Sequence, residues 1–214
     1  MQQKKFSYLY IAVVLVILSL LGFGLTQAMA ETATGTTAVV NRLHDGLLQA
    51  MRGGSAMGYA GRYKTIESTV KQSFDFPAIA RVALGRHWAK LSEDQHSRFL
   101  ETFVRLSVAT YASRFDGFSG ESFHNLGEQA GGDGRTTVRT ELRKADGDAV
   151  KLDYVLNKTN DNWLIVNVIA DGVSDLSLKR ADYSAVMKSD GIDKLITKLN
   201  DKIALYSTTK AKVY

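Results

Sequence analysis

Residue types that commonly do chemistry are few and scattered in this chain. Its four histidines are His44, His87, His96 and His124. None lies four residues from another, as a helical metal-binding pair requires, and neither HExxH nor His-x-His occurs. The chain has no cysteine, so thiol catalysis and disulfide bonds are excluded. We expect no metal and no cofactor, and we interpret the histidines as structural or surface residues.

Carboxylates and glycine-rich segments offer equally weak signals. Asp171 and Asp175 flank Gly172 and could supply a base in a small cavity, but a turn residue and a helix cap explain them better. No G-x-S-x-G nucleophile motif occurs. The glycine-rich segment 131–134 joins two expected strands and precedes no helix, so it lacks the setting of a phosphate-binding loop. The sequence therefore predicts no catalytic residues.

The first half of the chain has helical periodicity. Apolar residues predict helices at about 38–51 and 56–72, with Gly53 and Gly54 ending the first. Asp75 and Pro77 indicate the start of a short helix that ends at Gly85. Ser92 and Gln95 form a capping box for the longest helix, which we expect to reach about Phe115.

The period changes to two after residue 120. Strands are predicted at 121–129, 136–144, 150–157 and 163–170, and turn residues separate the last three. The last of these is apolar enough to suggest cover on both faces. Two helices follow, near 177–187 and 192–206. The fold class is therefore α+β: an antiparallel sheet of about four strands, with N- and C-terminal helices packed on one face.

The N-terminus has the features of a secretory signal. Lys4 and Lys5 precede the apolar stretch 9–25, and residues 28–30 fit a small-x-small cleavage site before Glu31. An uncleaved anchor is the alternative, and both place the body outside the inner membrane. Without the two lysines the net charge falls from +5 to +3, and basic residues form no run of three, which argues against nucleic acid. The predicted organisation is signal peptide 1–30, flexible leader 31–37, domain 38–208 and C-terminal tail 209–214.

Several motifs resemble one family, the MlaC-type phospholipid-binding proteins, also called toluene-tolerance proteins. The resembling segments are Phe74-Asp75-Phe76, Ala80 to Arg86 with Trp88, Leu91-Ser92, Trp163 to Val168, Gly172-Val173-Ser174, Arg180 and Tyr183. The segment from Tyr111 to Phe118 is similar to the hopanoid-associated branch, HpnM. Asn167 departs from the family pattern, which usually has Asp there, and the weakly basic composition makes headgroup charge a less certain element of specificity.

The resemblance implies a periplasmic lipid carrier that holds acyl chains in an apolar cavity between sheet and helices. Carried over by position, the lining would be Val150, Leu152, Tyr154, Val166 and Val168 on the sheet, with Phe99, Phe103 and Tyr111 on the long helix. It would carry phospholipid or a hopanoid-type lipid as a monomer, without chemistry. Its partners would be an inner-membrane lipid transporter and an outer-membrane lipoprotein complex.

Two other functions stay open at this point. The chain could be an enzyme of cone-shaped α+β type acting on a hydrophobic substrate, with Asp171 or His124 as its buried base. It could also be an adaptor that bridges envelope complexes and holds no ligand. Periodicity does not separate a filled core from an apolar pocket, so the space between sheet and helices distinguishes these alternatives.

Overall fold

The computed structural model describes residues 35–208, and from Thr36 on they lie in one compact unit. Its elements in chain order are α2 (Thr36–Ser73), α3 (Phe76–Leu84), the 3-10 helix η2 (Gly85–Lys90), α4 (Glu93–Arg114), β1 (Ser122–Ala130), β2 (Thr136–Arg143), β3 (Ala149–Thr159), β4 (Asn162–Ala170), β5 (Val173–Ser174), α5 (Asp175–Ser189) and α6 (Gly191–Thr208). The predicted α+β class is confirmed, and the two-residue strand β5 adds to the four expected strands. The predicted signal and tail lie outside the described residues.

Helix α2 is two helical segments joined by a reversal. Gly54 and Gly58 have φ values of 46° and 64°, which residues with a side chain adopt at a cost, so the predicted stop near residue 54 is confirmed. The helix begins at Thr36, inside the predicted leader, because Glu128 of β1 holds its first turn. One Glu128 carboxylate oxygen accepts from the Thr36 hydroxyl at 2.5 Å and from the Thr37 N–H at 3.0 Å.

A buried arginine fastens the helix reversal. Arg62 is 7% exposed, and its guanidinium donates to the carbonyls of Ala112, near the end of α4, and Gly54, at 2.9 and 3.0 Å. Carbonyls at helix ends lack hydrogen-bond partners within the helix. The Arg62 guanidinium therefore supplies donors to two such carbonyls, one at the end of each helix. The sequence offered no signal for this role.

The starts of α3 and α4 follow the sequence closely. Asp75 caps α3 by accepting from Ala78 N–H at 2.9 Å, and its second carboxylate oxygen accepts from the Thr159 hydroxyl of β3. Ser92 and Gln95 form the predicted capping box of α4. These contacts fix the chain where it passes from α2 to α4 beside the sheet.

The sheet is an antiparallel meander with the strand order β1-β2-β3-β4-β5. Two irregularities interrupt its register. One lies between Asn125 and Gly127 on β1, and the other shifts β4 against β3 between Val155 and Leu156. The expected cover on both faces of β4 is wrong, because only Ile165 of that strand is fully buried.

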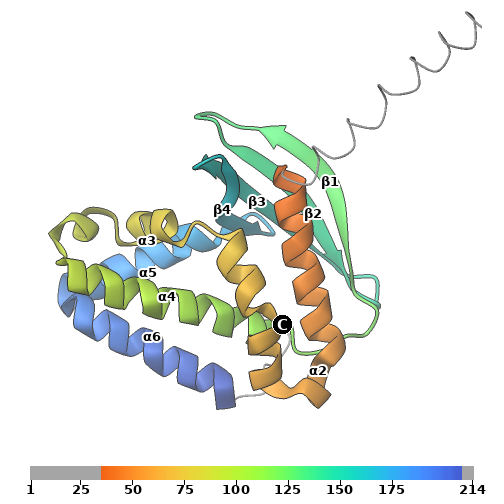
Figure 1. The fold of residues 1–214 in the computed structure, drawn as a ribbon, viewed down its shortest axis with the longest axis horizontal. Coiled ribbons are helices and arrows are strands. Elements are labelled where there is room, and N and C mark those ends of the chain that lie inside the picture. Colours follow the sequence, from red (N-terminus) through yellow and green to blue (C-terminus); the bar gives the residue numbers. More distant parts are fainter. Residues whose placement is uncertain (1–34, 209–214) are drawn as a thin grey trace, which may run out of the picture. The chain divides into compact units, whose positions relative to one another are not determined.

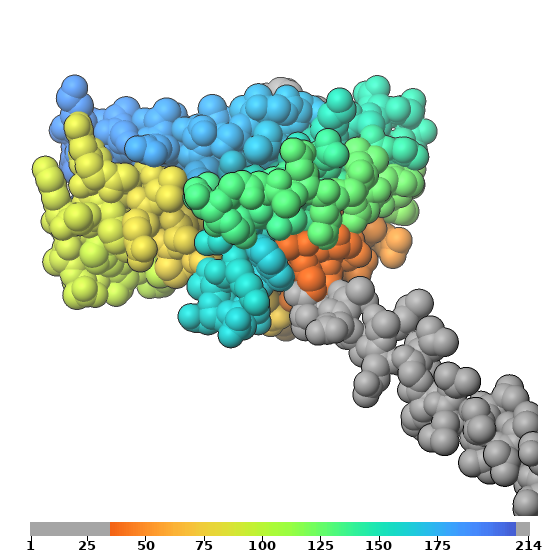
Figure 2. All heavy atoms as spheres, turned by 90° about the horizontal axis from the view of Figure 1, so that it is seen from above, coloured from red at the N-terminus to blue at the C-terminus, as the bar shows by residue number. Residues whose placement is uncertain are grey.

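Figure 1 shows the helices on one side of the sheet. Helix α2 contacts β1, β2 and β4, while α3 and α5 contact β4, and α4 packs against α2, α3 and α6. The strands gather towards one end of the view in Figure 2, and the yellow η2 region lies at the other. No helix within residues 35–208 is both long and apolar enough to cross a membrane.

Candidate functional site

The eight predicted lining residues fall into two groups. Phe99 and Phe103 of α4 are 0% and 1% exposed, and their rings stack at 5.7 Å. Tyr183 of α5 meets both rings edge-on, and Phe76 of α3 meets Phe103 at 6.0 Å. We call Phe76, Phe99, Phe103 and Tyr183 the helical aromatic cluster. Its ring contacts join three helices and include no aromatic residue of the sheet.

The second group lies on the inner face of the sheet. Tyr154 pairs with Val138 on one side and Val168 on the other, and Leu152 occupies the same face two residues earlier. Tyr154 is 1% exposed, whereas Leu152 and Val168 are half-buried and pack against the core. Val150 lies on this face too, opposite Leu142, and is half-buried.

Val166 needs a correction. The register pairs Leu156 with Ile165 and Val155 with Asn167, which leaves Val166 as the extra residue of a β-bulge. Strict alternation would put Val166 on the same face as Val168. The bulge gives that inner position to Ile165, which is 0% exposed. Val166 itself is half-buried.

Tyr111 connects α4 to the sheet through neighbouring rings. It lies 5.9 Å from Phe74 and from Phe115, and Phe115 lies 6.5 Å from Phe123 of β1. Burial raises the pKa of the Tyr111 hydroxyl, yet the side chain keeps accessible surface. Several apolar residues on the inner sheet face are likewise half-buried and packed against the core. We define the sheet-side seam as Tyr111, Phe115, Phe123, Leu152, Trp163 and Val168.

The expected apolar cavity is closed at three of its predicted lining residues. A side chain that borders a water-sized void keeps accessible surface, and Phe99, Phe103 and Tyr154 keep 1% or less. One hollow in the described part of the chain, of about 660 Å³, lies between α2 and α4. Another, of about 410 Å³, lies between η2 and α5. Neither is lined by any of the eight predicted residues.

A buried histidine closes one side of the seam. His44 of α2 is 5% exposed and stacks on Phe123 at 3.8 Å, and its Nε2 lies 3.0 Å from the Tyr154 hydroxyl oxygen. Desolvation lowers the pKa of His44 to about 4, so the ring is neutral at pH 7. We interpreted His44 from the sequence as a structural or surface residue, and no sequence pattern identified its partner on β3.

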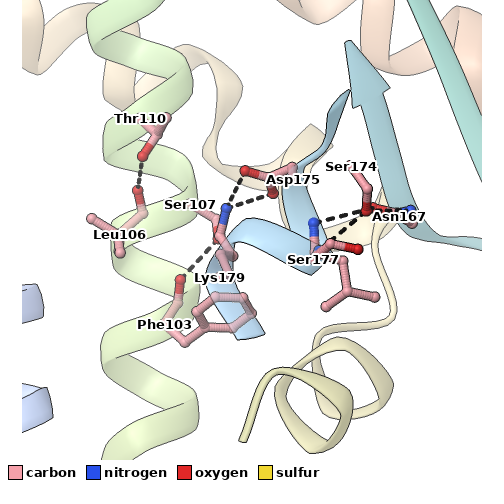
Figure 3. Close-up of polar contacts among 10 residues, drawn as sticks. Phe103, Leu106, Ser107, Thr110, Asn167, Ser174, Asp175, Ser177 and Lys179 are labelled. Atoms are coloured by element: carbon pink, nitrogen blue, oxygen red, sulfur yellow. Dashed lines mark hydrogen bonds and ion pairs between the residues drawn. The ribbon is translucent and has the colours of Figure 1, made fainter. Parts of the chain in front are cut away.

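The β4–α5 corner is a hydrogen-bonded cap (Figure 3). Asn167 Oδ1 accepts from Leu176 N–H at 3.2 Å, and the Ser174 hydroxyl oxygen accepts from Ser177 N–H at 3.1 Å. Asp175 and Lys179 form an ion pair at 2.5 Å beside this cap. Asn167 therefore has a structural role at this corner.

The proposed catalytic candidates lie in ordinary structural positions. Asp171 is exposed and accepts from Lys151 N–H at 2.9 Å, as expected for a turn residue. His124 lies 2.9 Å from the Ser122 hydroxyl, and His96 stacks on Trp88 at 4.1 Å. Within residues 35–208 no three acidic or histidine side chains group as metal ligands would, and no buried side-chain polar atom lacks a partner.

Comparisons with known proteins agree with this geometry. The family model described as MlaC protein matches residues 41–201. The intermembrane phospholipid transport system binding protein MlaC of Haemophilus influenzae is 28% identical over 121 residues, which are 54% of this chain and 56% of that protein. The chain thus spans about half the length of that relative.

A solved structure has the same fold. The phospholipid-binding protein from Ralstonia solanacearum, determined in complex with a phospholipid, matches with a TM-score of 0.70. The match covers 80% of this chain and 98% of that one, at 20% sequence identity. Helices packed on one antiparallel sheet are therefore a shared architecture.

Proposed function

The chain belongs to the MlaC protein family, and from that premise we propose that it is a phospholipid carrier that works without chemistry. The observation that carries this proposal is the sheet-side seam. Its six apolar side chains are packed against the core yet only half-buried, on the inner face of the sheet and at the end of α4 that meets it. An acyl chain would take its place among them.

The energetics suit a carrier. Each methylene removed from water contributes roughly 0.8 kcal/mol, so an acyl chain is strongly held against escape into water. Transfer from the seam to a bilayer changes little, because both surroundings are apolar. Loading and unloading at membranes therefore need only contact, and no reacting group is required.

Binding requires the helices and the sheet to separate along the seam. The helical aromatic cluster is fully packed and would stay intact, whereas Tyr111, Leu152 and Val168 already keep accessible surface. Helix α4 packs on other helices and few of its residues approach the sheet, whereas α2, α3 and α5 are attached to β4, so the separation would lie between α4 and the sheet. We propose that the lining is the inner-face set Val150, Leu152, Tyr154 and Val168 with Tyr111.

We further propose an extracytoplasmic location and membrane-complex partners. Export rests on residues 1–30 of the sequence, with their two lysines and apolar core. The partners would be an inner-membrane lipid transporter and an outer-membrane lipoprotein complex. The related protein from Haemophilus influenzae is described as part of an intermembrane phospholipid transport system, which supports this assignment.

A hopanoid-type lipid is the second candidate cargo. The supporting observation is the segment from Tyr111 to Phe118, which resembles the hopanoid-associated HpnM branch and contributes Tyr111 and Phe115 to the seam. Flat aromatic walls suit a rigid polycyclic ligand as well as a flexible chain. Lipid extracted from the purified protein and identified by mass spectrometry separates the two cargoes.

The decisive test adds a charge to the seam. Leu152→Glu places a carboxylate without a partner on the inner face, which is costly in apolar surroundings, so we expect lipid loading to fall at least tenfold by native mass spectrometry. Val155→Glu is the matched control, because Val155 lies three residues away on the opposite face of the same strand and is also half-buried.

Several outcomes would contradict the proposal. A folded Leu152→Glu protein with normal loading would rule out the inner face as the lining. Protein that is always empty, even after incubation with phospholipid vesicles, would favour the adaptor alternative. Activity on a hydrophobic substrate that Asp171→Asn or His124→Gln abolishes, without unfolding, would favour an enzyme.

A further inference from the structure

A second hollow lies at the junction of η2 and α5 and is strongly basic. Its volume is about 410 Å³, which is within the range of small-molecule sites. The lining residues are Gly85, Arg86, His87, Arg180, Ser184, Ala185 and Lys188. We call this hollow the η2–α5 pocket. It shares no residue with the sheet-side seam.

Helix α5 supplies one wall by regular spacing. Arg180, Ser184 and Lys188 are four residues apart, so they form one stripe along the helix. The stripe contains a guanidinium, a hydroxyl and an ammonium, and all three can donate hydrogen bonds. The contacts of α5 with α3 and η2 place this stripe beside the turn that contains Arg86 and His87.

Gly85 lets the arginine of α5 approach the opposite wall. Its φ of 53° ends α3, and its N–H donates to the Arg81 carbonyl. A Cβ at this position would lie 3.7 Å from Arg180 Nη2 and 3.8 Å from Nε. The guanidinium therefore lies against the bare backbone of the turn, and no side chain from residue 85 separates it from the pocket.

The charges in the pocket are uncompensated. No carboxylate lines it, and no ion pair recorded within residues 35–208 includes Arg86, Arg180 or Lys188. Adjacent positions behave differently, since Lys179 pairs with Asp175 at 2.5 Å. Cations that share a hollow repel one another, and an anion bound between them would remove that repulsion.

We propose that the η2–α5 pocket binds the phosphate group of a phosphoester. Arginine matches phosphate oxygens with paired N–H donors, and lysine adds a point charge. The Ser184 hydroxyl adds a further hydrogen-bond donor to the lining. Free phosphoesters and the headgroups of a membrane surface both present this group.

Two titrations test the pocket and separate the sources. Calorimetry with sn-glycerol 3-phosphate and with inorganic phosphate measures soluble anions. Co-sedimentation with phosphatidylcholine vesicles, with and without phosphatidylglycerol, measures surface binding. We expect the double variant Arg180→Gln with Lys188→Gln to weaken binding at least tenfold. The matched control, Arg42→Gln with Lys64→Gln, removes the same charge from exposed positions on α2 and should change binding less than twofold.

Each outcome decides the proposal. Saturable glycerol phosphate binding that the pocket variant loses supports a soluble phosphoester, and loss restricted to phosphatidylglycerol vesicles supports a headgroup at a membrane. No binding in either titration, or an equal loss in the control, would overturn the inference. Arg86→Gln provides a second route if the α5 variant fails to fold, because it removes a pocket cation from an exposed position outside that helix. Lipid loading through the seam should be unchanged in all these variants.

Discussion

The helical aromatic cluster and the sheet-side seam are both built from large apolar side chains, but they differ in closure. The four cluster residues are between 0% and 6% exposed, with ring contacts in every direction among three helices. The seam residues are half-buried, although they pack against the same core. The cluster holds the helices together, and the seam is where the proposed opening would occur. Separating these roles lets a protein release a ligand without loosening its framework.

The largest expected effect comes from the cluster. Phe103→Ala removes a ring with 1% exposure and leaves a cavity among three helices, so we expect a loss of about 3–5 kcal/mol in the free energy of unfolding. Tyr111→Leu in the seam should cost clearly less, because its ring is only half-buried. Urea denaturation measures both. Equal losses in the two variants would remove the distinction between the regions.

The pH response should come from His44, the buried histidine that stacks on Phe123 of the seam. Because the pKa of His44 is about 4 in the folded protein and 6.5 in the unfolded chain, stability is fully present above pH 6.5 and falls as pH drops towards 4. The expected loss is on the order of 3 kcal/mol. Thermal unfolding at pH 7.5 and 4.5 should show it.

A matched variant isolates this contribution. His44→Gln keeps a side-chain partner for the Tyr154 hydroxyl but cannot be protonated, so the part of the pH dependence between 6.5 and 4 should shrink. If His44→Gln retains the full wild-type slope, carboxylates elsewhere cause it, and His44 is no pH-sensitive element of the seam.

The smallest expected effect concerns the corner that joins sheet to α5. Asn167→Ala removes the acceptor for Leu176 N–H, and we expect a loss of about 1 kcal/mol in unfolding free energy. Asn167→Asp keeps the acceptor, and Asp175 in the same turn opposes any gain from its charge, so its stability should be near that of the wild type. A loss of lipid loading in Asn167→Ala without a loss of stability would make this corner part of the seam.

Helix caps and the helix reversal could be predicted from the sequence, because nearby residues determine them. The capping box at Ser92 and Gln95, the Asp75 cap and the reversal near Gly54 all depend on residues within a few positions. Buried stripes were also predictable, since Phe99, Phe103 and Leu106 recur at helical spacing. The family resemblance added the expected layer order, which periodicity alone leaves open.

Features that depend on distant partners were missed. The bulge at Val166 is set by pairing with β3, so alternation within β4 assigned the wrong residue to the inner face. Arg62 and His44 are buried because Ala112 and Tyr154 accept or share their hydrogen bonds, at separations of 50 and 110 residues. The sequence also could not predict that the expected cavity is closed at Phe99, Phe103 and Tyr154. An apolar stripe has the same pattern whether it borders a filled core or an empty cavity.

The link between Glu128 and the start of α2 has a consequence for self-association. Strand β1 lies at an edge of the described sheet, and a long regular edge is a template for pairing with another molecule. The irregularity at Gly127 interrupts that template, and Glu128 keeps the strand engaged with Thr36 and Thr37. In the proposed carrier function, each opening of the seam would expose apolar surface. We expect this edge to limit aggregation during those openings, when fibril-like stacking would otherwise begin.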